Sequence, residues 1–334
     1  MRESGNRQMD WEWSEHQLRW LYRKLKKRIT KKPVEFSRYA GKEVLAIQAG
    51  NDCIRQAVLS GGPFMACRFG NVELNAMTKF EMAVRKAETA SDKQLSQSGW
   101  SVRGRRKAIK RLCSNAGFFP EQEMMGVRFA GLMQQSCGQA DLIGVWFNPM
   151  EDYMIAHYAP QAAMTYLRGL EPWYSQMPWT MALKDKRVLV IHPFADTIEK
   201  QYDRRDLLFP GTDLLPEFQL RTVKAVQTIA GTKDSRFENW FEALDWMEQE
   251  AMKEEFDIAI IGCGAYGLPL AARLKAHGRQ AIHLGGAAQL LFGIRGARWD
   301  NHEIISRLFN ESWVRPSEEE KPAGASQVEG ACYW

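Results

Sequence analysis

The chain has 334 residues, of which 45% are hydrophobic, and its formal net charge is +5. This length and composition are typical of a globular protein with a sizeable core, which excludes a fibrous or largely disordered chain. No run approaches the ~20 continuous apolar residues that span a bilayer, and the first residues have no apolar core like that of a signal peptide. The six cysteines lack the close spacing of zinc or redox motifs, which suits a reducing compartment. We therefore expect a cytoplasmic protein.

Residues 1–39 are expected to form a basic amphipathic helical extension. Leu18, Leu21, Leu25 and Ile29 repeat at helical spacing, with basic residues among them and tryptophans nearby. Two interpretations stay open: the helix packs on the domain through its leucines, or it lies on an anionic membrane surface. In the second case the protein would be peripheral at the inner face of a membrane. No nucleic-acid partner is expected.

Residues 40–315 are expected to form one domain in which strands alternate with helices. Apolar runs predict strands at 63–70, 141–147, 187–194, 218–227, 256–262 and 280–286. Amphipathic or alanine-rich segments predict helices at 72–87, 105–115, 120–136, from about 151, 197–209, 240–255, 268–278 and 287–294. Two polar or proline-containing stretches, 88–104 and 171–180, are expected to be loops, and 316–334 a flexible tail.

This alternation predicts an α/β fold with a Rossmann-like, mostly parallel sheet flanked by helices. Sheets of this kind bind ligands beyond the carboxyl ends of their strands. The segments that directly follow the predicted strands are polar or rich in glycine, and they lie at 68–73, 148–149, 192–196, 262–267 and 283–286. We expect these segments to meet in one nucleotide- or phosphate-binding crevice.

Gly262, Gly264 and Gly267 form a G-x-G-x-x-G pattern between a predicted strand and a helix, and Tyr266 lies within it. Such glycines let the backbone approach a phosphate, and the helix N-terminus supplies N–H donors. An NAD site would also need an acidic residue after the next strand. That place holds His283, Gly285 and Gly286. A dinucleotide oxidoreductase is therefore disfavoured, and tight packing turns without a ligand remain the alternative.

An arginine followed by a carboxylate at a strand end can bind a phosphate and a divalent metal ion. Arg68 ends the first predicted strand and is followed by Gly70, Asn71 and Glu73. Hard divalent cations take carboxylate oxygens as ligands and bridge diphosphates. The alternative is an Arg–Glu ion pair that closes the turn, which contributes little when it is exposed.

Two histidines, His192 and His283, end different predicted strands. A histidine at such a place can bind a phosphate or act as a base, because its ordinary pKa lies near neutrality. The alternative is a histidine that only holds its own turn through hydrogen bonds.

The sequence resembles the GT-D-fold bacterial glycosyltransferases. The segment CRFGNVEL (67–74) is similar to the R-[FIY]-G-D-G-E-L segment of that family, and residues 256–299 resemble the C-terminal block of GT-D-like proteins. Together with VLVIHPF (188–194), the resemblance spans the chain from about 60 to 300. It implies a GT-D-like fold, a nucleotide-sugar co-substrate and a D-x-E motif that holds a divalent metal, Mn²⁺ or Mg²⁺.

The resemblance also implies roles for single residues. Glu73 would be the metal carboxylate, Asn71 stands where the family has the aspartate, and Arg68 would face the phosphates. Asparagine can still ligate through its carbonyl but brings no charge. The other expected donor-binding residues are Gly70, Gly262, Gly264, Tyr266, Gly267, His283, Gly285 and Gly286.

Two functions are therefore expected as alternatives. The first is a hexosyltransferase-like glycosyltransferase that transfers a sugar from a nucleoside-diphosphate sugar to a cell-surface glycan or glycoconjugate. Glu73 would then belong to the catalytic group, and Asp196 or His192 would act as a base on the acceptor hydroxyl. The second is a non-catalytic nucleotide- or sugar-binding protein derived from such an enzyme, an alternative that the uncharged Asn71 motivates.

Overall fold

The computed structural model describes residues 15–16, 18–26, 28–29, 35–89, 99–322, 324–327 and 331–334. Within these residues, one nine-stranded sheet has the order β1-β2-β5-β4-β3-β9-β8-β6-β7. Its strands are β1 (Arg38–Tyr39), β2 (Lys42–Leu45), β3 (Phe64–Cys67), β4 (Leu142–Val145), β5 (Ala163–Tyr166), β6 (Arg187–His192), β7 (Gln219–Lys224), β8 (Ile258–Ile261) and β9 (Gln280–His283). In this sheet β1 and β2 pair antiparallel and the other neighbours pair parallel. The predicted α/β class is confirmed.

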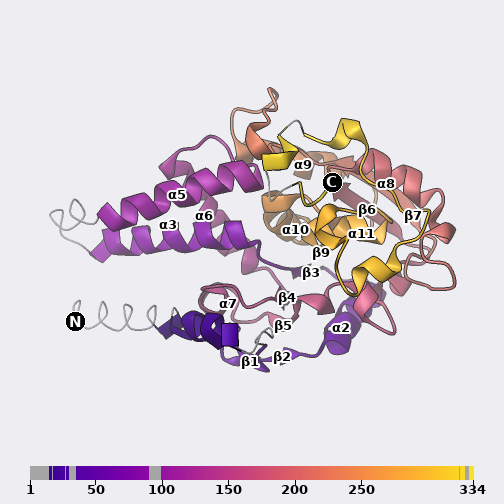
Figure 1. Cartoon of the computed structure of the whole chain (residues 1–334), viewed down its shortest axis with the longest axis horizontal. Coiled ribbons are helices and arrows are strands. Elements are labelled where there is room, and N and C mark those ends of the chain that lie inside the picture. The colour runs from indigo at the N-terminus through magenta and orange to yellow at the C-terminus, as the bar shows by residue number, and fades with distance from the viewer. Residues whose placement is uncertain are drawn as a thin grey trace.

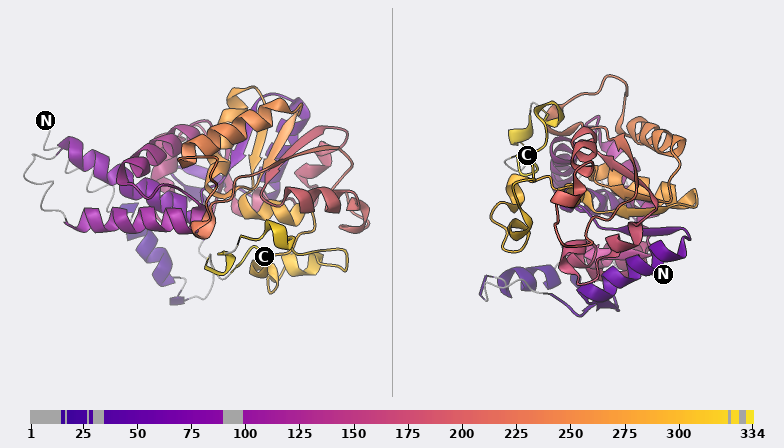
Figure 2. Two further views of the ribbon diagram at one scale, coloured as in Figure 1. Left: turned by 90° about the horizontal axis from the view of Figure 1, so that it is seen from above. Right: turned by 90° about the vertical axis from the view of Figure 1, so that its right-hand side faces the viewer.

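Helices cover both faces of the sheet. They are α2 (Ile47–Ser60), α3 (Asn71–Thr89), α5 (Gly99–Ala116), α6 (Glu123–Cys137), α7 (Glu151–Tyr158), α8 (Ala195–Tyr202), α9 (Trp240–Lys253), α10 (Gly267–Ala276) and α11 (Ala288–Leu291). One apolar core includes Phe80 of α3 and Trp240 of α9, and the other includes Ile54 of α2 and Ile198 of α8. Beyond the end of the sheet, α3 and α5 run side by side (Figure 1, Figure 2).

The central strands are buried and mostly apolar because helices cover both of their sides; Gln280 and His283 of β9 are the polar exceptions. Every residue of β3, β4, β8 and β9 is buried. Parallel strands that are covered on both faces carry continuous apolar runs rather than an alternating pattern. This is why the sequence predicted these strands.

Two neighbouring strands, β3 and β9, send the chain to opposite faces of the sheet. They pair in parallel at the centre. The helix after β3, α3, packs in the first core through Leu74 and Met77, whereas α11 after β9 packs in the second through Leu290. A crevice opens at the carboxyl ends of two such strands, where open α/β sheets bind their ligands.

Several elements differ from those expected from the sequence. The expected loop at 88–104 is partly helical, because α5 already begins at Gly99; residues 90–98 lie outside the described residues. The helix continues toward Ile109 and Leu112, which are both buried and hold it on the first core. The sequence predicted no β1, β2, α2 or β5, since each is short or only partly buried along its length.

The tail at 316–334 was expected to be flexible, but its described residues pack on the domain. Glu320 is buried, and its Oε1 accepts the backbone N–H of Thr197 at 3.1 Å. The ring of Trp334 is also buried and meets Phe194 edge to face. Buried aromatic surface and backbone hydrogen bonds offset the entropy lost on ordering the segment.

The N-terminal segment is helical at the described residues 15–16, 18–26 and 28–29, as expected. It does not pack through its leucines: Leu18 is 63% exposed and Ile29 81%. The contact with the domain is made by other side chains, among them His16 and Arg23. In the described part of the chain, no helix is long and apolar enough to cross a membrane.

Candidate functional site

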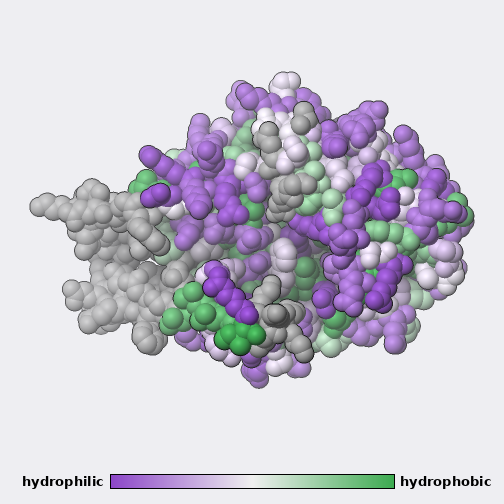
Figure 3. All heavy atoms as spheres, in the orientation of Figure 1, coloured by the Kyte–Doolittle hydropathy of each residue, from purple (hydrophilic) through white to green (hydrophobic). Residues whose placement is uncertain are grey.

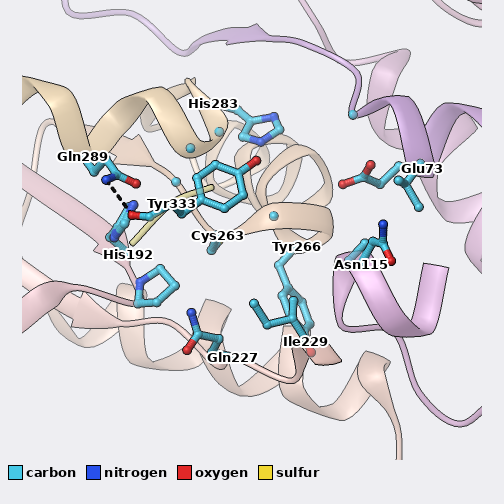
Figure 4. A pocket seen from close by; sticks show the side chains of 18 of the residues that line it. Glu73, Asn115, His192, Gln227, Ile229, Cys263, Tyr266, His283, Gln289 and Tyr333 are labelled. Carbon is cyan, nitrogen blue, oxygen red and sulfur yellow. Dashed lines mark hydrogen bonds between the residues drawn. The ribbon is translucent and has the colours of Figure 1, made fainter. Parts of the chain in front are cut away.

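A cavity of about 150 Å³ lies at the carboxyl ends of β3, β9, β8 and β6. Arg68 and Glu73 line it together with Gly264 and Gly285, so that the turns after three different strands open into one space. Figure 4 shows Glu73 and Asn115 on one side and His192 and Gln289 on the other. The predicted strand-end segments after β3, β6, β8 and β9 therefore meet in this cavity, whereas Asn148 and Pro149, after β4, do not line it.

Arg68 brings a positive charge to the wall of this cavity. Its guanidinium lies over the ring of Trp146, 4.8 Å from the ring centroid, and donates to the carbonyl of Phe69 at 3.1 Å. The Nε of Arg68 is buried and has no hydrogen-bond partner among the described residues. A planar guanidinium with an unused donor is suited to phosphate oxygens.

Glu73 lies in the first turn of α3, with its carboxylate folded over Gly70. A Cβ at Gly70 would collide with that carboxylate, which explains why glycine stands there. Asn71 is exposed and lines the same cavity. Among the described lining residues, Glu73 is the sole carboxylate.

These residues do not fit a metal ion held by the protein alone. The described chain contains no group of three or more His, Cys, Asp or Glu side chains that could hold a metal ion. A Mg²⁺ ion that arrives with a diphosphate needs only one or two carboxylates. Glu73 and Asn71 both line the cavity.

His192 is held as a neutral ring. Its Nδ1 accepts the backbone N–H of Phe194 at 3.0 Å, which places the ring proton on Nε2. Burial lowers the pKa of His192 to about 3. A group of such low basicity is poorly matched to general-base catalysis near neutral pH. We therefore interpret His192 as a hydrogen-bond donor.

His283 is also buried and neutral. Neither of its ring nitrogens has a hydrogen-bond partner within the described structure. Burial lowers its pKa to about 3, and the positive charge of Arg68 acts in the same direction. The Arg68 backbone lies near enough to offset part of this lowering. His283 lines the cavity, and its ring packs on Gly267, with Nε2 on that side.

The glycine motif has a different role at each of its three glycines. A Cβ at Gly262 would collide with the ring of His192, and one at Gly267 with the ring of His283. Gly264 has a φ of +59° and nothing within 4 Å of its Cβ position. Gly267 does not line the cavity. Only Gly264, of these three, leaves its backbone open to a ligand, and the others make room for the histidines.

The side chains within this motif are buried. Tyr266 stacks on Trp240 with ring centroids 4.6 Å apart, and its hydroxyl lies 3.4 Å from that of Thr228. Burial raises the pKa of Tyr266 and of the Cys263 thiol well above their ordinary values. Both groups are therefore neutral parts of the cavity wall, and the thiol is a poor nucleophile.

The C-terminal residues close one side of the cavity, which the sequence did not predict. Arg298 lies over the ring of Tyr333 at 4.6 Å, and its backbone N–H donates to the carbonyl of Cys332 at 2.9 Å. Gln289 donates to the Tyr333 carbonyl at 3.1 Å, the dashed line in Figure 4. A Cβ at Gly286 would collide with the Tyr333 ring. The apolar character of the last residues was the one signal for this contact.

Asp196 lies outside the cavity. Its side chain is 55% exposed and pairs with Lys224 at 2.5 Å. Asp196 stands in the first turn of α8 and does not line the cavity. The structure therefore does not bring Asp196 to the site, and its expected role as a base does not carry over.

No protein-family model matches the sequence, and no curated protein matches it. Among solved structures, a selenomethionine-substituted structure of the domain of unknown function 1792 has 14% identity, covering 73% of this chain and 78% of that one, with a TM-score of 0.37. Another structure of domain 1792, described as having a distinct glycosyltransferase fold, has 13% identity, covering 83% and 92%, with a TM-score of 0.41. The chain is similar to the domain of unknown function 1792. At these identities and TM-scores the likeness does not decide a function, which depends on the site itself.

Proposed function

We propose that the protein is a glycosyltransferase that takes its sugar from a nucleoside diphosphate. The observation that supports this is the shared cavity: Arg68 and Glu73, after β3, face the same space as Gly264 and Gly285, after β8 and β9. A cationic group, an open glycine backbone and a carboxylate are the three features that binding a diphosphate and activating a hydroxyl require.

The departing diphosphate would be stabilised by fixed positive charge. Arg68 and Arg298 both line the cavity, and the backbone around Gly264 lies at the start of the turn into α10. Pre-oriented charges and N–H groups act most strongly where negative charge develops in the transition state. If a divalent cation came with the diphosphate and bound Glu73 and Asn71, it would neutralise further charge, and Glu73 would then be a ligand instead of the base.

Glu73 is the side chain that we assign as the base for the acceptor hydroxyl. Asp196 lies outside the cavity, and the lowered pKa of His192 makes its ring a weak base. Glu73 is nearly buried and is the sole carboxylate among the described lining residues. In Figure 4 its carboxylate points toward the middle of the cavity.

The volume of the cavity requires the C-terminal residues to move. Ligand pockets for molecules of this size have volumes of roughly 300–1,000 Å³, whereas this cavity has about 150 Å³ with Tyr333 and Trp334 in place. We therefore expect Tyr333 to leave its position on Gly286 when a nucleotide sugar binds.

Calorimetric titration with UDP- and GDP-sugars, with and without Mn²⁺, tests the proposal. We expect at least one of these donors to bind, and slow release of its sugar to water to be detectable. No binding of any donor would refute the proposal.

The second candidate is a non-catalytic nucleotide- or sugar-binding protein, which is favoured by Asn71 in place of a charged ligand. A binder of this kind would take up the donor and leave it intact over the same period. Donor hydrolysis therefore separates the two functions.

A further inference from the structure

The N-terminal helix presents an apolar face that nothing in the described structure covers. Leu18, Tyr22, Leu25 and Ile29 are 63%, 55%, 56% and 81% exposed. Their spacing of four, three and four residues places them on one side of a helix. In Figure 3, hydrophobic side chains gather over this helix at the lower left of the view.

The opposite side of the same helix is fixed to the domain. His16 Nδ1 lies 2.6 Å from the carboxylate of Asp152 in α7, and the guanidinium of Arg23 lies 4.9 Å from the ring centroid of Phe147. His16 and Arg23 are seven residues apart and therefore share a side. The apolar face is open to solvent, and its Leu18 and Tyr22 also border a groove beside Tyr39.

Basic side chains flank the apolar face on both sides. Arg19 and Lys26 lie along one border and Lys24 and Arg28 along the other, as the helical period requires, and all four are exposed. Between residues 15 and 29 the one acidic residue is Glu15, which pairs with Arg19 at 2.6 Å. An apolar stripe bordered by Lys and Arg is the arrangement of helices that lie in the plane of an anionic membrane surface.

We propose that this helix binds the surface of an anionic lipid bilayer. A second copy of the chain is a poorer occupant, because pairing two such helices would bring like charges together. A protein that wraps around a basic amphipathic helix is also a poorer occupant, because the side with His16 and Arg23 is already taken. A bilayer needs only the one free face.

The helix and the cavity share one edge of the sheet. Trp146, which follows β4, lines the cavity and also lines the groove beside Trp20, Arg23 and Lys24. Binding of a bilayer at this face would therefore hold the carboxyl edge of the sheet close to the lipid. The inference stands apart from the proposed function, since it needs no nucleotide.

Sedimentation of the full chain with vesicles tests this. We expect binding to vesicles of equal phosphatidylglycerol and phosphatidylcholine and little to phosphatidylcholine alone. Leu25→Ser/Ile29→Ser should lower the partition coefficient at least about tenfold, because two buried apolar side chains are lost. Leu59→Ser/Leu207→Ser, at sites 61% and 56% exposed elsewhere on the surface, should bind as the wild type does.

A second variant tests the contribution of the basic residues separately from that of the apolar side chains. Lys24→Gln/Lys26→Gln should lower binding to the anionic vesicles by about fivefold per lysine. Failure of the wild type to bind, or equal binding by all variants, would overturn the inference. So would a lipid-free dimer, seen by light scattering, that Leu25→Ser/Ile29→Ser converts to a monomer.

Discussion

Arg68 and Gly285, from the ends of neighbouring strands, lie against each other: a Cβ on Gly285 would be 3.2 Å from the Arg68 Nε. Because Gly285 has no side chain, the Arg68 guanidinium has room to lie beside it at the cavity. We expect Arg68→Gln to weaken binding of a nucleoside diphosphate about 10–100-fold, because hydrogen bonds to charged groups contribute about 1.5–3 kcal/mol. Calorimetry measures this. Arg106→Gln in α5, at a side chain 76% exposed, is the matched control, and an equal loss in both variants would contradict the assignment.

Glu73→Gln distinguishes a base from a metal ligand. If the arginines supply the charge that the diphosphate needs, donor affinity in EDTA should change less than about threefold, while transfer should fall by about 10²-fold or more. Calorimetry and a turnover assay measure the two effects. Asn71→Asp, which adds a carboxylate beside Glu73, should create or strengthen a dependence on Mn²⁺. If the wild type binds the donor only in the presence of Mn²⁺, Glu73 would be a metal ligand and not the base.

Tyr333→Ala should open the cavity. Because the Tyr333 ring lies on Gly286 and narrows the space, removing it should raise the association rate of a nucleotide sugar several-fold. Stopped-flow fluorescence follows this rate. A slower association or a lower affinity would mean that Tyr333 contacts the ligand rather than excluding it.

Gly267→Ala should destabilise the fold by about 1–3 kcal/mol, because its Cβ would collide with the His283 ring in a closely packed interior. Removing the ring as well, in Gly267→Ala/His283→Ala, should cost at least about 1 kcal/mol less than the sum of the two single changes. Urea unfolding of the four proteins gives this difference. Additive costs would show that the two positions do not meet.

His283→Gln should flatten part of the pH dependence of stability. The pKa of His283 is about 3 in the folded chain, below the ordinary value near 6.5. The unfolded chain therefore binds more protons as the pH falls from about 6.5 to 3, and stability drops by up to about 1.4 kcal/mol per pH unit.

Other buried groups titrate in the same range, so the comparison has to be between variants. Burial raises the pKa of Glu151 to about 8 and that of Glu171 to about 7. Because these two carboxyls hold their protons more tightly in the folded chain, they lower the free energy of unfolding as the pH rises. Their contribution is the same in the wild type and in His283→Gln, so it cancels when the unfolding free energies of the two proteins are subtracted. Parallel profiles between pH 6 and 4 would contradict a neutral buried His283.

The strands that build the site could be predicted, because parallel strands covered on both faces carry apolar runs, as in residues 188–191 of β6 and Ile258–Ile261 of β8. The turns that follow them could also be placed at one edge, since parallel strands end at the same side of a sheet. The short β5, with only two of its four residues buried, gives no such run. The start of α5 was missed because the segment before it is rich in Ser and Gln, which resembles a loop.

The other residues of the cavity could not be predicted, because no local pattern connects them to it. Asn115 lies at the end of α5, Gln227 follows β7, and Arg298 and Tyr333 come from the last quarter of the chain. Nor could the sequence show that Gly262 and Gly267 serve the histidines. In a sequence, a glycine that makes room for a neighbouring side chain cannot be told from one that lets a phosphate approach the backbone.

The glycine–histidine contacts also limit how this sequence can vary among relatives. Gly262 faces His192 at the end of β6, and Gly267 faces His283 at the end of β9. A relative that keeps either imidazole has to keep the opposing glycine, and one that loses the imidazole becomes free to place alanine or serine there. These two pairs should therefore covary, and their joint loss would mark the branches in which the pocket has changed its ligand.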